Sequence, residues 1–276
     1  MAVAEAAVSG ETFRDGPLRT TVARRPWVVL AYHAVGDVSP AHDPDRLVQP
    51  PDKFEWQLRT LVKRGYEFVT ATDFAGRLRA GGPLDGTCAV TFDDGTTDNL
   101  TVLPEILRPL GIPATVFACP GLLGEPDPYI APESGLRIMN ADELREITSM
   151  GYEVGAHTNR HVDLADASAE GAYAEMLSCK QALEDLLGVP VDTFAYPFCR
   201  YSAACPAAAE RAGYLAAYTC GGKGGRLPFE LRREMMDSSD GPISWALKSR
   251  RRYDETLALP PVRLALAARR AVVRRS

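Results

Sequence analysis

Several features that would define other kinds of protein are missing from this chain of 276 residues. No apolar run approaches the ~20 residues that a membrane-spanning helix needs. Residues 1–16 carry acidic side chains where a signal peptide needs a basic segment, and no apolar stretch follows them. We therefore expect a cytoplasmic protein.

Cysteine and histidine are both scarce. The six cysteines form no Cys-x-x-Cys pair and are too sparse for a disulfide scaffold. We expect reduced, mostly buried thiols at Cys88, Cys119, Cys179, Cys199, Cys205 and Cys220. The four histidines are His33, His42, His157 and His161, so any site that needs imidazole must draw on these.

Charge is distributed unevenly along the chain. The net charge is -5, but residues 246–276 carry nine Lys or Arg against two acids, a local +7, which leaves -12 for the rest. An acidic main domain argues against a nucleic-acid partner, and only the tail is suited to an anionic surface. With 46% hydrophobic and 24% charged residues, we expect one globular domain at 26–245, preceded by an arm at 1–25 and followed by a basic tail at 246–276.

Short apolar runs alternate with stretches of helical periodicity. Strands are expected at 27–32, 68–69, 88–92, 114–119, 152–154, 193–196 and 215–219. Helices are expected from residue 54 to Gly65, from a cap at Thr72, at 100–110, from a capping box at Asn140 and Glu143 to Met150, and at 168–187. This alternation predicts an α/β fold with a parallel sheet, either open or closed into a barrel.

Two adjacent carboxylates, Asp93 and Asp94, follow the apolar run 88–92, and Gly95 turns the chain. Taken alone, Asp-Asp-Gly is equally a polar turn. His157 and His161, four residues apart after another expected strand, could complete a site of one carboxylate and two imidazoles. Such a metal site leaves positions open for water and substrate, as hydrolysis requires. The alternative is that both histidines are polar loop residues.

Three segments together resemble a known family. TFDDG at 91–95, HTNRH at 157–161 and FAYPFCRYS at 194–202 occur in the order of the polysaccharide deacetylase family, also called the NodB-homology domain or carbohydrate esterase family 4. The resemblance extends from YHAV at 32–35 to about residue 220. It implies an irregular (β/α)7 barrel in a single domain, with the site at the carboxyl ends of the strands.

The resemblance also implies a role for each motif residue. Asp93 would be the general base, and Asp94, His157 and His161 would hold one divalent metal ion; zinc is the default, although cobalt, nickel or manganese fits the same ligands. The division between the aspartates has a physical basis, because a metal-bound carboxylate is a poor proton acceptor. The backbone N–H of Phe198 would stabilise the oxyanion. The substrate-binding segment would be Tyr196, Pro197, Phe198 and Cys199.

The chain departs from the family pattern in three places. Many members have, at the position of Ala195, an Arg that pairs with the base. Here Arg232 or Arg233 would have to replace that Arg. The alternative is that both are surface residues. Cys199 follows Phe198 at a position where the family usually has Gly. This substitution puts a thiol near the site, or it is a plain exchange of one small residue for another. The C-terminal Leu-x-His that supplies the general acid is missing. The poly-N-acetylglucosamine deacetylase branch carries Tyr-His after its first strand, so His33 is the candidate acid, or else a structural histidine at a strand end.

These features predict a metal-dependent N-deacetylase that releases acetate from an N-acetylated amino sugar in a cytoplasmic glycan, glycolipid precursor or glycoside. The alternatives are a catalytically impaired, glycan-binding family member or an amidohydrolase for a non-sugar amide. The tail segment PVRLALAARRAVVRRS mixes apolar and basic residues and resembles a segment that binds anionic lipids. It would place the protein at the inner membrane face, or it packs on the acidic domain instead.

Overall fold

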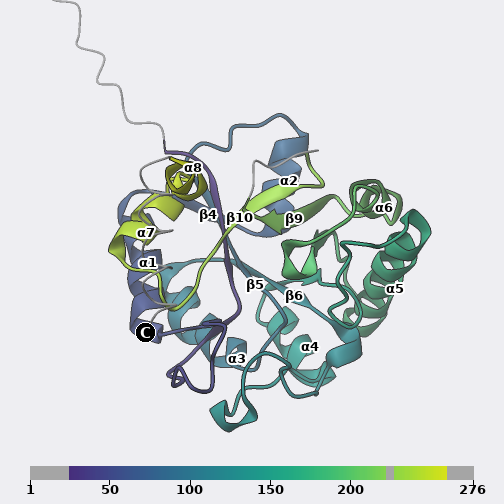
Figure 1. Cartoon of the computed structure of the whole chain (residues 1–276), viewed down its shortest axis with the longest axis horizontal. Helices are drawn as coiled ribbons and strands as arrows, with labels where there is room; N and C mark the ends of the chain where they lie inside the picture. The colour runs from purple at the N-terminus through teal and green to yellow at the C-terminus, as the bar shows by residue number, and fades with distance from the viewer. Residues whose placement is uncertain (1–24, 222–226, 260–276) are drawn as a thin grey trace, which may run out of the picture.

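Seven parallel strands close into a barrel in the part of the chain that the computed structural model describes, residues 25–221 and 227–259 (Figure 1). The order around the barrel is β1, β10, β9, β8, β7, β6 and β5, and β5 pairs with β1 to close the ring. The strands are β1 (Val28–Tyr32), β5 (Thr87–Phe92), β6 (Ala114–Ala118), β7 (Glu153–Ala156), β8 (Thr193–Ala195), β9 (Ala216–Cys220) and β10 (Leu231–Met235). The predicted (β/α)7 barrel is confirmed.

Three short strands lie outside this ring. β4 (Glu67–Val69) pairs with the first half of β5, at 87–89, whereas β6 pairs with its second half, at 90–92. β2 (Ala34–Val35) and β3 (Val48–Gln49) form a separate parallel pair that anchors the loop after β1. The side chains of that loop are therefore held near the carboxyl end of β1.

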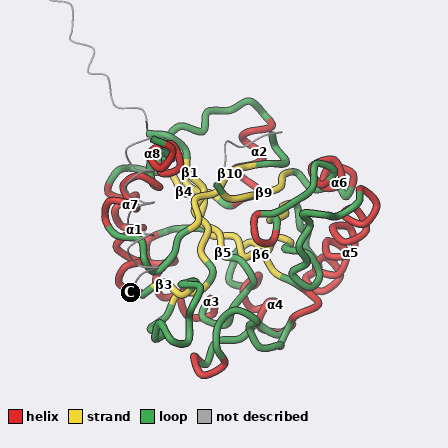
Figure 2. Tube along the Cα trace, viewed as in Figure 1, coloured by secondary structure: helices red, strands yellow, loops and turns green. Residues whose placement is uncertain are grey.

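Helices surround the strands, which lie in the middle of the molecule (Figure 2). They are α1 (Pro51–Lys63), α2 (Ala71–Arg79), α3 (Asn99–Val102), α4 (Ala141–Ser149), α5 (Ala169–Leu187), α6 (Cys205–Arg211), α7 (Pro242–Lys248) and α8 (Tyr253–Ala258). Because helices cover the outside and side chains fill the inside, barrel strands are buried on both faces and read as continuous apolar runs. No helix within residues 25–221 and 227–259 is long and apolar enough to cross a bilayer.

Several helices begin or end at capping residues that the sequence shows. The capping box at Asn140 and Glu143 is formed and starts α4. Ser168 caps α5, and Gly188 ends it with a φ of 70°, a left-handed conformation that glycine adopts without steric cost. The cap of α2 is Thr70, whose hydroxyl accepts the N–H of Asp73, and the prediction of Thr72 was wrong.

The continuous helix predicted at 100–110 is broken into three pieces. α3 ends at Val102, a π-helical turn covers Leu103–Leu107, and a 3-10 turn covers Arg108–Leu110. Pro104 and Pro109 lie in the two turns. Since proline lacks the N–H that an α-helix needs and its ring clashes with the preceding turn, a regular helix cannot run through both.

The carboxyl-terminal end of the described chain is part of the fold. The boundary expected between 245 and 246 falls inside α7, where Trp245 and Lys248 are both buried. The ammonium group of Lys248 donates to Asp240 at 2.6 Å. Residues 246–259 therefore pack with the main domain, and residues 260–276 of the basic tail, like residues 1–24 of the arm, lie outside the described residues.

Candidate active site

Asp93 and Asp94 follow the carboxyl end of β5, and both carboxylates lie beside the imidazole of His157. The N–H of Asp93 donates to Tyr32 O at 2.8 Å and so continues the pairing of β5 with β1. Neighbours in an extended strand point to opposite faces, but Asp94 has a φ of 67°, which breaks that alternation. His157 Nε2 accordingly lies 4.0 Å from a carboxylate oxygen of Asp93 and 3.7 Å from one of Asp94.

The two imidazoles are oriented by hydrogen bonds through Nδ1. His157 follows β7, and its Nδ1 lies 2.7 Å from Ala195 O, which can only accept, so Nδ1 carries the proton and Nε2 keeps a lone pair. His161 Nδ1 lies 2.7 Å from the hydroxyl of Tyr129, and its Nε2 lies 3.4 Å from Asp94 Oδ1. Burial lowers the pKa of His157 to about 4 and that of His161 to about 3, so both rings are neutral near pH 7.

Asp94, His157 and His161 fit a divalent metal ion. One donor atom from each lies within 4.8 Å of the other two, and ligands at about 2.1 Å in a tetrahedron lie about 3.4 Å apart. Both histidines present Nε2 while Nδ1 is engaged by a protein group, the arrangement that fixes a metal-binding ring. Two imidazoles and one carboxylate suit zinc and several other divalent ions.

Asp93 is paired with Arg233, one of the two arginines considered from the sequence. The guanidinium group donates to both carboxylate oxygens, at 2.6 and 2.8 Å, and the Arg233 side chain is fully buried. Burial alone would raise the pKa of the Asp93 carboxyl, but Arg233 and His157 outweigh it and hold that pKa below its ordinary value. Asp93 is therefore ionised and fixed in orientation.

Arg232 lies on the other face of β10 and does not reach the pocket. Its guanidinium pairs with Glu234 at 2.8 Å and with Asp254 of α8 at 3.2 Å. Side chains alternate along a strand, so Arg232 faces outward while its neighbour Arg233 faces inward. Of the two candidates, only Arg233 lies beside the base.

His33 follows β1 and lines the same pocket as Asp93. Its Nδ1 is buried without a hydrogen-bond partner among the described residues. Burial lowers the pKa of His33 from its ordinary value of 6.5, although the charge of Asp93 raises it. An imidazole with an unpaired nitrogen beside a carboxylate can take up and deliver a proton.

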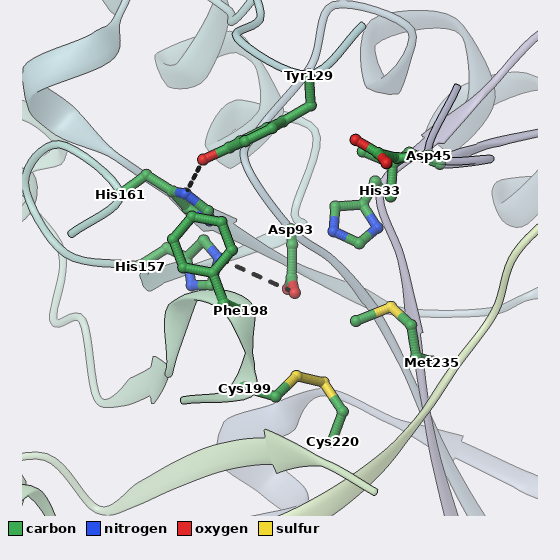
Figure 3. Close-up of a pocket in the computed structure, with 11 residues that line it drawn as sticks. His33, Asp45, Asp93, Tyr129, His157, His161, Phe198, Cys199, Cys220 and Met235 are labelled. Atoms are coloured by element: carbon green, nitrogen blue, oxygen red, sulfur yellow. Dashed lines mark hydrogen bonds and ion pairs between the residues drawn. A yellow bond between two sulfur atoms is a disulfide. The ribbon is translucent and has the colours of Figure 1, made fainter. Parts of the chain in front are cut away.

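The pocket that contains these groups has a volume of about 470 Å³. Asp93 lies between His157 and His33, with Tyr129 and Phe198 on one side and Met235 on the other (Figure 3). The lining residues are His33, Asp45, Leu47, Asp93, Tyr129, His157, His161, Phe198, Cys199, Cys220 and Met235. No Lys or Arg is among these described lining residues, so the walls suit an uncharged ligand better than an anion.

The segment expected to bind substrate divides into two parts. Phe198 is 48% exposed, and its ring meets that of His161 edge-on at 4.4 Å. Cys199 also lines the pocket, but Tyr196 and Pro197 are buried and do not. The Tyr196 hydroxyl donates to Phe229 O at 3.0 Å, and its ring stacks on Tyr201. Tyr196 thus supports the wall from behind.

Two of the six cysteines are joined, which corrects the expectation that all are reduced. Cys199 and Cys220 form a disulfide, with their Cα atoms 5.3 Å apart. The other four are free and buried, as expected. The two partners are 21 residues apart in sequence and become neighbours only because β8 and β9 are adjacent in the barrel, which composition and spacing could not indicate.

Several pocket residues carried no signal in the sequence. Tyr129 comes from the long connection after β6, and Asp45 and Leu47 come from the loop after β1. Asp45 is exposed at the rim, beside His33 in Figure 3. The loop that carries it is fixed by Asp43, whose carboxylate accepts the N–H groups of Leu47 and Val48 at 2.8 and 2.9 Å. Only Asp43, an Asx-type turn former, could have suggested an ordered loop.

Comparison with known proteins agrees with this geometry. The model of the polysaccharide deacetylase family matches residues 81–217, and the chain belongs to that family. YxkH of Bacillus subtilis, named after the same family, is 24% identical over 187 residues, which make up 67% of this chain and 61% of YxkH. A chitin deacetylase of a Pestalotiopsis species is 32% identical over 114 residues, or 41% of this chain and 34% of that enzyme. The chain thus matches less than two thirds of the length of these curated relatives.

A solved structure shares the fold over nearly its whole length. The Streptococcus pyogenes deacetylase PplD, solved in complex with acetate, superposes with a TM-score of 0.67 at 24% identity. The match covers 82% of this chain and 98% of PplD. At this level of identity the likeness establishes the common barrel.

Proposed function

We propose that this protein is a metal-dependent N-deacetylase that hydrolyses the acetamide of an N-acetylated amino sugar and releases acetate. One observation carries the proposal: the three donors Asp94, His157 and His161 converge beside Asp93, an ionised carboxylate that lines the pocket and that Arg233 holds in place. Membership of the polysaccharide deacetylase family supports the reaction class. The test is acetate release from N-acetylated glucosamine oligomers by the metal-loaded protein, and binding of these oligomers without acetate release would favour the glycan-binding alternative.

Each residue of the site has a proposed role that follows from its surroundings. Asp93 accepts a proton from the attacking water, and Arg233, which donates to both carboxylate oxygens, holds the Asp93 side chain in one orientation. Asp94, His157 and His161 would hold a divalent metal ion, which would act as a Lewis acid that lowers the pKa of water and polarises the carbonyl. The backbone N–H of Phe198 is the proposed further donor to the oxyanion.

His33 is the proposed general acid, since it lies in the same pocket with an unpaired nitrogen. Replacement of His33 by Ala should slow acetate release by about 10²-fold or more, in the range typical of general acid catalysis. An acid must be protonated to act. In the wild type, kcat/KM should therefore fall as the pH rises through the lowered pKa of His33, below 6.5, and this limb should disappear in the variant.

Metal content is the control for the His33 variant, because His33 is not among the three donors. Its metal content should match that of the wild type. An unchanged rate and pH profile in His33→Ala would exclude His33 as the acid and leave a water molecule or another group in that role.

The substrate class follows from the pocket and the family together. A pocket with no lining Lys or Arg among the described residues, and with Asp45 at its rim, suits a neutral N-acetylated sugar. A non-sugar amide remains the second candidate within the same chemistry. We further propose zinc as the metal and a cytoplasmic glycan, glycolipid precursor or glycoside as the source of the sugar.

The basic tail is proposed to hold the enzyme at the inner membrane face. Each basic residue near an anionic surface contributes about 1 kcal/mol, and 263–275 contain five arginines. Full-length protein should therefore sediment with anionic vesicles at low salt, whereas a chain that ends at Leu259 should sediment much less. Equal, salt-independent sedimentation of both proteins would contradict the proposal and favour a soluble saccharide as substrate.

A further inference from the structure

We propose that the Cys199–Cys220 disulfide is a thiol–disulfide exchange site for low-molecular-weight thiols, and that its oxidised form is the active form of the enzyme. The link between redox state and activity rests on the proposed deacetylase function, but the exchange itself does not. Three features of the disulfide point to this role: it is accessible from the pocket, it holds a turn, and it contacts Arg233.

A small thiol can reach this disulfide through the substrate pocket. Cys199 and Cys220 are both partly exposed and both line that pocket. Figure 3 shows the S–S bond in the pocket wall, with Met235 nearby. The other four cysteines are buried, and burial raises the pKa of Cys88, Cys119 and Cys179 above the ordinary value. Exchange requires an accessible sulfur, so it should be confined to this pair.

The disulfide fastens the turn that carries Phe198. This turn, Pro197–Cys199, connects the end of β8 to the following loop, and the disulfide ties it to the end of β9. Phe198 and Cys199 both have a φ of 55°, a left-handed conformation that non-glycine residues adopt only when their surroundings enforce it. The same turn presents the Phe198 ring to His161. The disulfide is the covalent part of the support for this geometry.

Cys220, the second cysteine of the disulfide, contacts the ion pair that Arg233 forms with the proposed base, Asp93. Arg233 Nη2 lies 3.9 Å from Cys220 Sγ and 2.8 Å from Asp93. A thiolate left at Cys220 would lie beside the same guanidinium that orients Asp93. Reduction thus affects both the turn with the proposed oxyanion donor and the partner of the base.

The exchange is balanced by two equivalents of thiol. The thiolate of the first small thiol attacks Cys199, which forms a mixed disulfide and breaks the protein S–S bond. Cys220 leaves as a thiolate beside Arg233 and takes up the proton that the small thiol released. A second thiolate then attacks the external sulfur of the mixed disulfide. Cys199 leaves as a thiolate, which is protonated, and the two small thiols depart as their disulfide. Two electrons and two protons pass from the small thiols to the protein.

The experiment uses the full chain loaded with metal. One sample is oxidised with glutathione disulfide, and a second is reduced with dithiothreitol and then desalted without air, so that the reductant cannot strip the metal. We expect four thiols per denatured chain before reduction and six after it, with peptide mapping locating the new thiols at Cys199 and Cys220. The kcat for acetate release should fall about 10-fold or more, since loss of one oxyanion donor typically costs about 10²–10³ in kcat. It should recover on reoxidation, with the metal content and circular dichroism spectrum unchanged throughout.

Two variants separate this site from general effects of thiols. Cys199→Ala combined with Cys220→Ala should have low kcat whether or not it is reduced, whereas Cys205→Ser, which alters a buried free cysteine, should keep the full response. Six thiols in the oxidised sample, equal kcat in both states, loss of metal on reduction, or an equal response in the double variant would each overturn the proposal. If no sample releases acetate, the deacetylase proposal fails, while the thiol count and the peptide map still decide whether the exchange site exists.

Discussion

Removal of the metal is expected to abolish acetate release, and substitution of His157 by Ala is expected to remove both metal and activity. The wild-type chain should bind one divalent ion, because a single set of three donors, Asp94, His157 and His161, converges in the described residues. Even residues that only orient a metal ligand typically contribute about 10–100-fold to affinity or activity. Loss of a ligand itself should therefore lower acetate release more than about 100-fold.

The matched control for this experiment is His42→Ala. It removes the same side chain from the loop after β1, where His42 lines no part of the pocket. Metal per chain, measured by elemental analysis, should be about one in the wild type and in His42→Ala and close to zero in His157→Ala. Full activity in metal-stripped protein, or normal metal content in His157→Ala, would contradict the assignment of the site.

The groups that the sequence could locate are those that end a buried strand. Asp93 and Asp94 follow β5, and His157 follows β7. Parallel strands bring their carboxyl ends to one face of the barrel, so a motif placed directly after a strand is also placed in space. That rule, together with the resemblance, was enough to predict the pocket and the fold.

The contacts of the supporting groups could not be predicted, because they join segments that are distant in the sequence. The sequence named Arg232 or Arg233 as the partner of Asp93 but could not choose between them, because the choice depends on the pairing of β10 with β1. LRREM, with three charged residues in five, does not have the apolar pattern of a buried strand. Tyr129 reaches His161 from a long connection without regular periodicity. Cys199, in the turn after β8, meets Cys220, at the end of β9, because the two strands are adjacent in the barrel. In each case the sequence specifies the residue, and its partner is determined by the closed barrel.

Replacement of Asp93 by Asn is expected to lower acetate release by about 10²–10⁴-fold, the usual contribution of a general base. Asn has the size of Asp and can still accept a hydrogen bond from Arg233, but it cannot take a proton from water. Metal content should stay near one ion per chain, because Asp93 is not one of the three donors. A rate close to that of the wild type would show that another group is the base.

The buried charge of Arg233 complicates the single variant, since removal of one partner of a buried ion pair typically costs about 3–5 kcal/mol of stability. A double variant, Asp93→Asn with Arg233→Met, separates stability from catalysis. Without the cation, no buried charge is left unpaired, so the free energy of unfolding should recover relative to Asp93→Asn. Acetate release should remain low. Recovery of activity together with stability would mean that Asp93 acts only as a structural partner of Arg233.

Arg233→Met alone tests the electrostatic part of the assignment through the pH profile. In the wild type, Arg233 outweighs the effect of burial and holds the pKa of Asp93 below its ordinary value of 3.8. Once the cation is removed, burial is opposed only by the smaller effects of His157 and His33, and the pKa of Asp93 should rise. Asp93 must be ionised to accept a proton, so the acidic limb of kcat/KM should move to higher pH, and the rate should recover as the pH is raised. A uniform fall in rate at every pH would mean that Arg233 positions the carboxylate without controlling its ionisation.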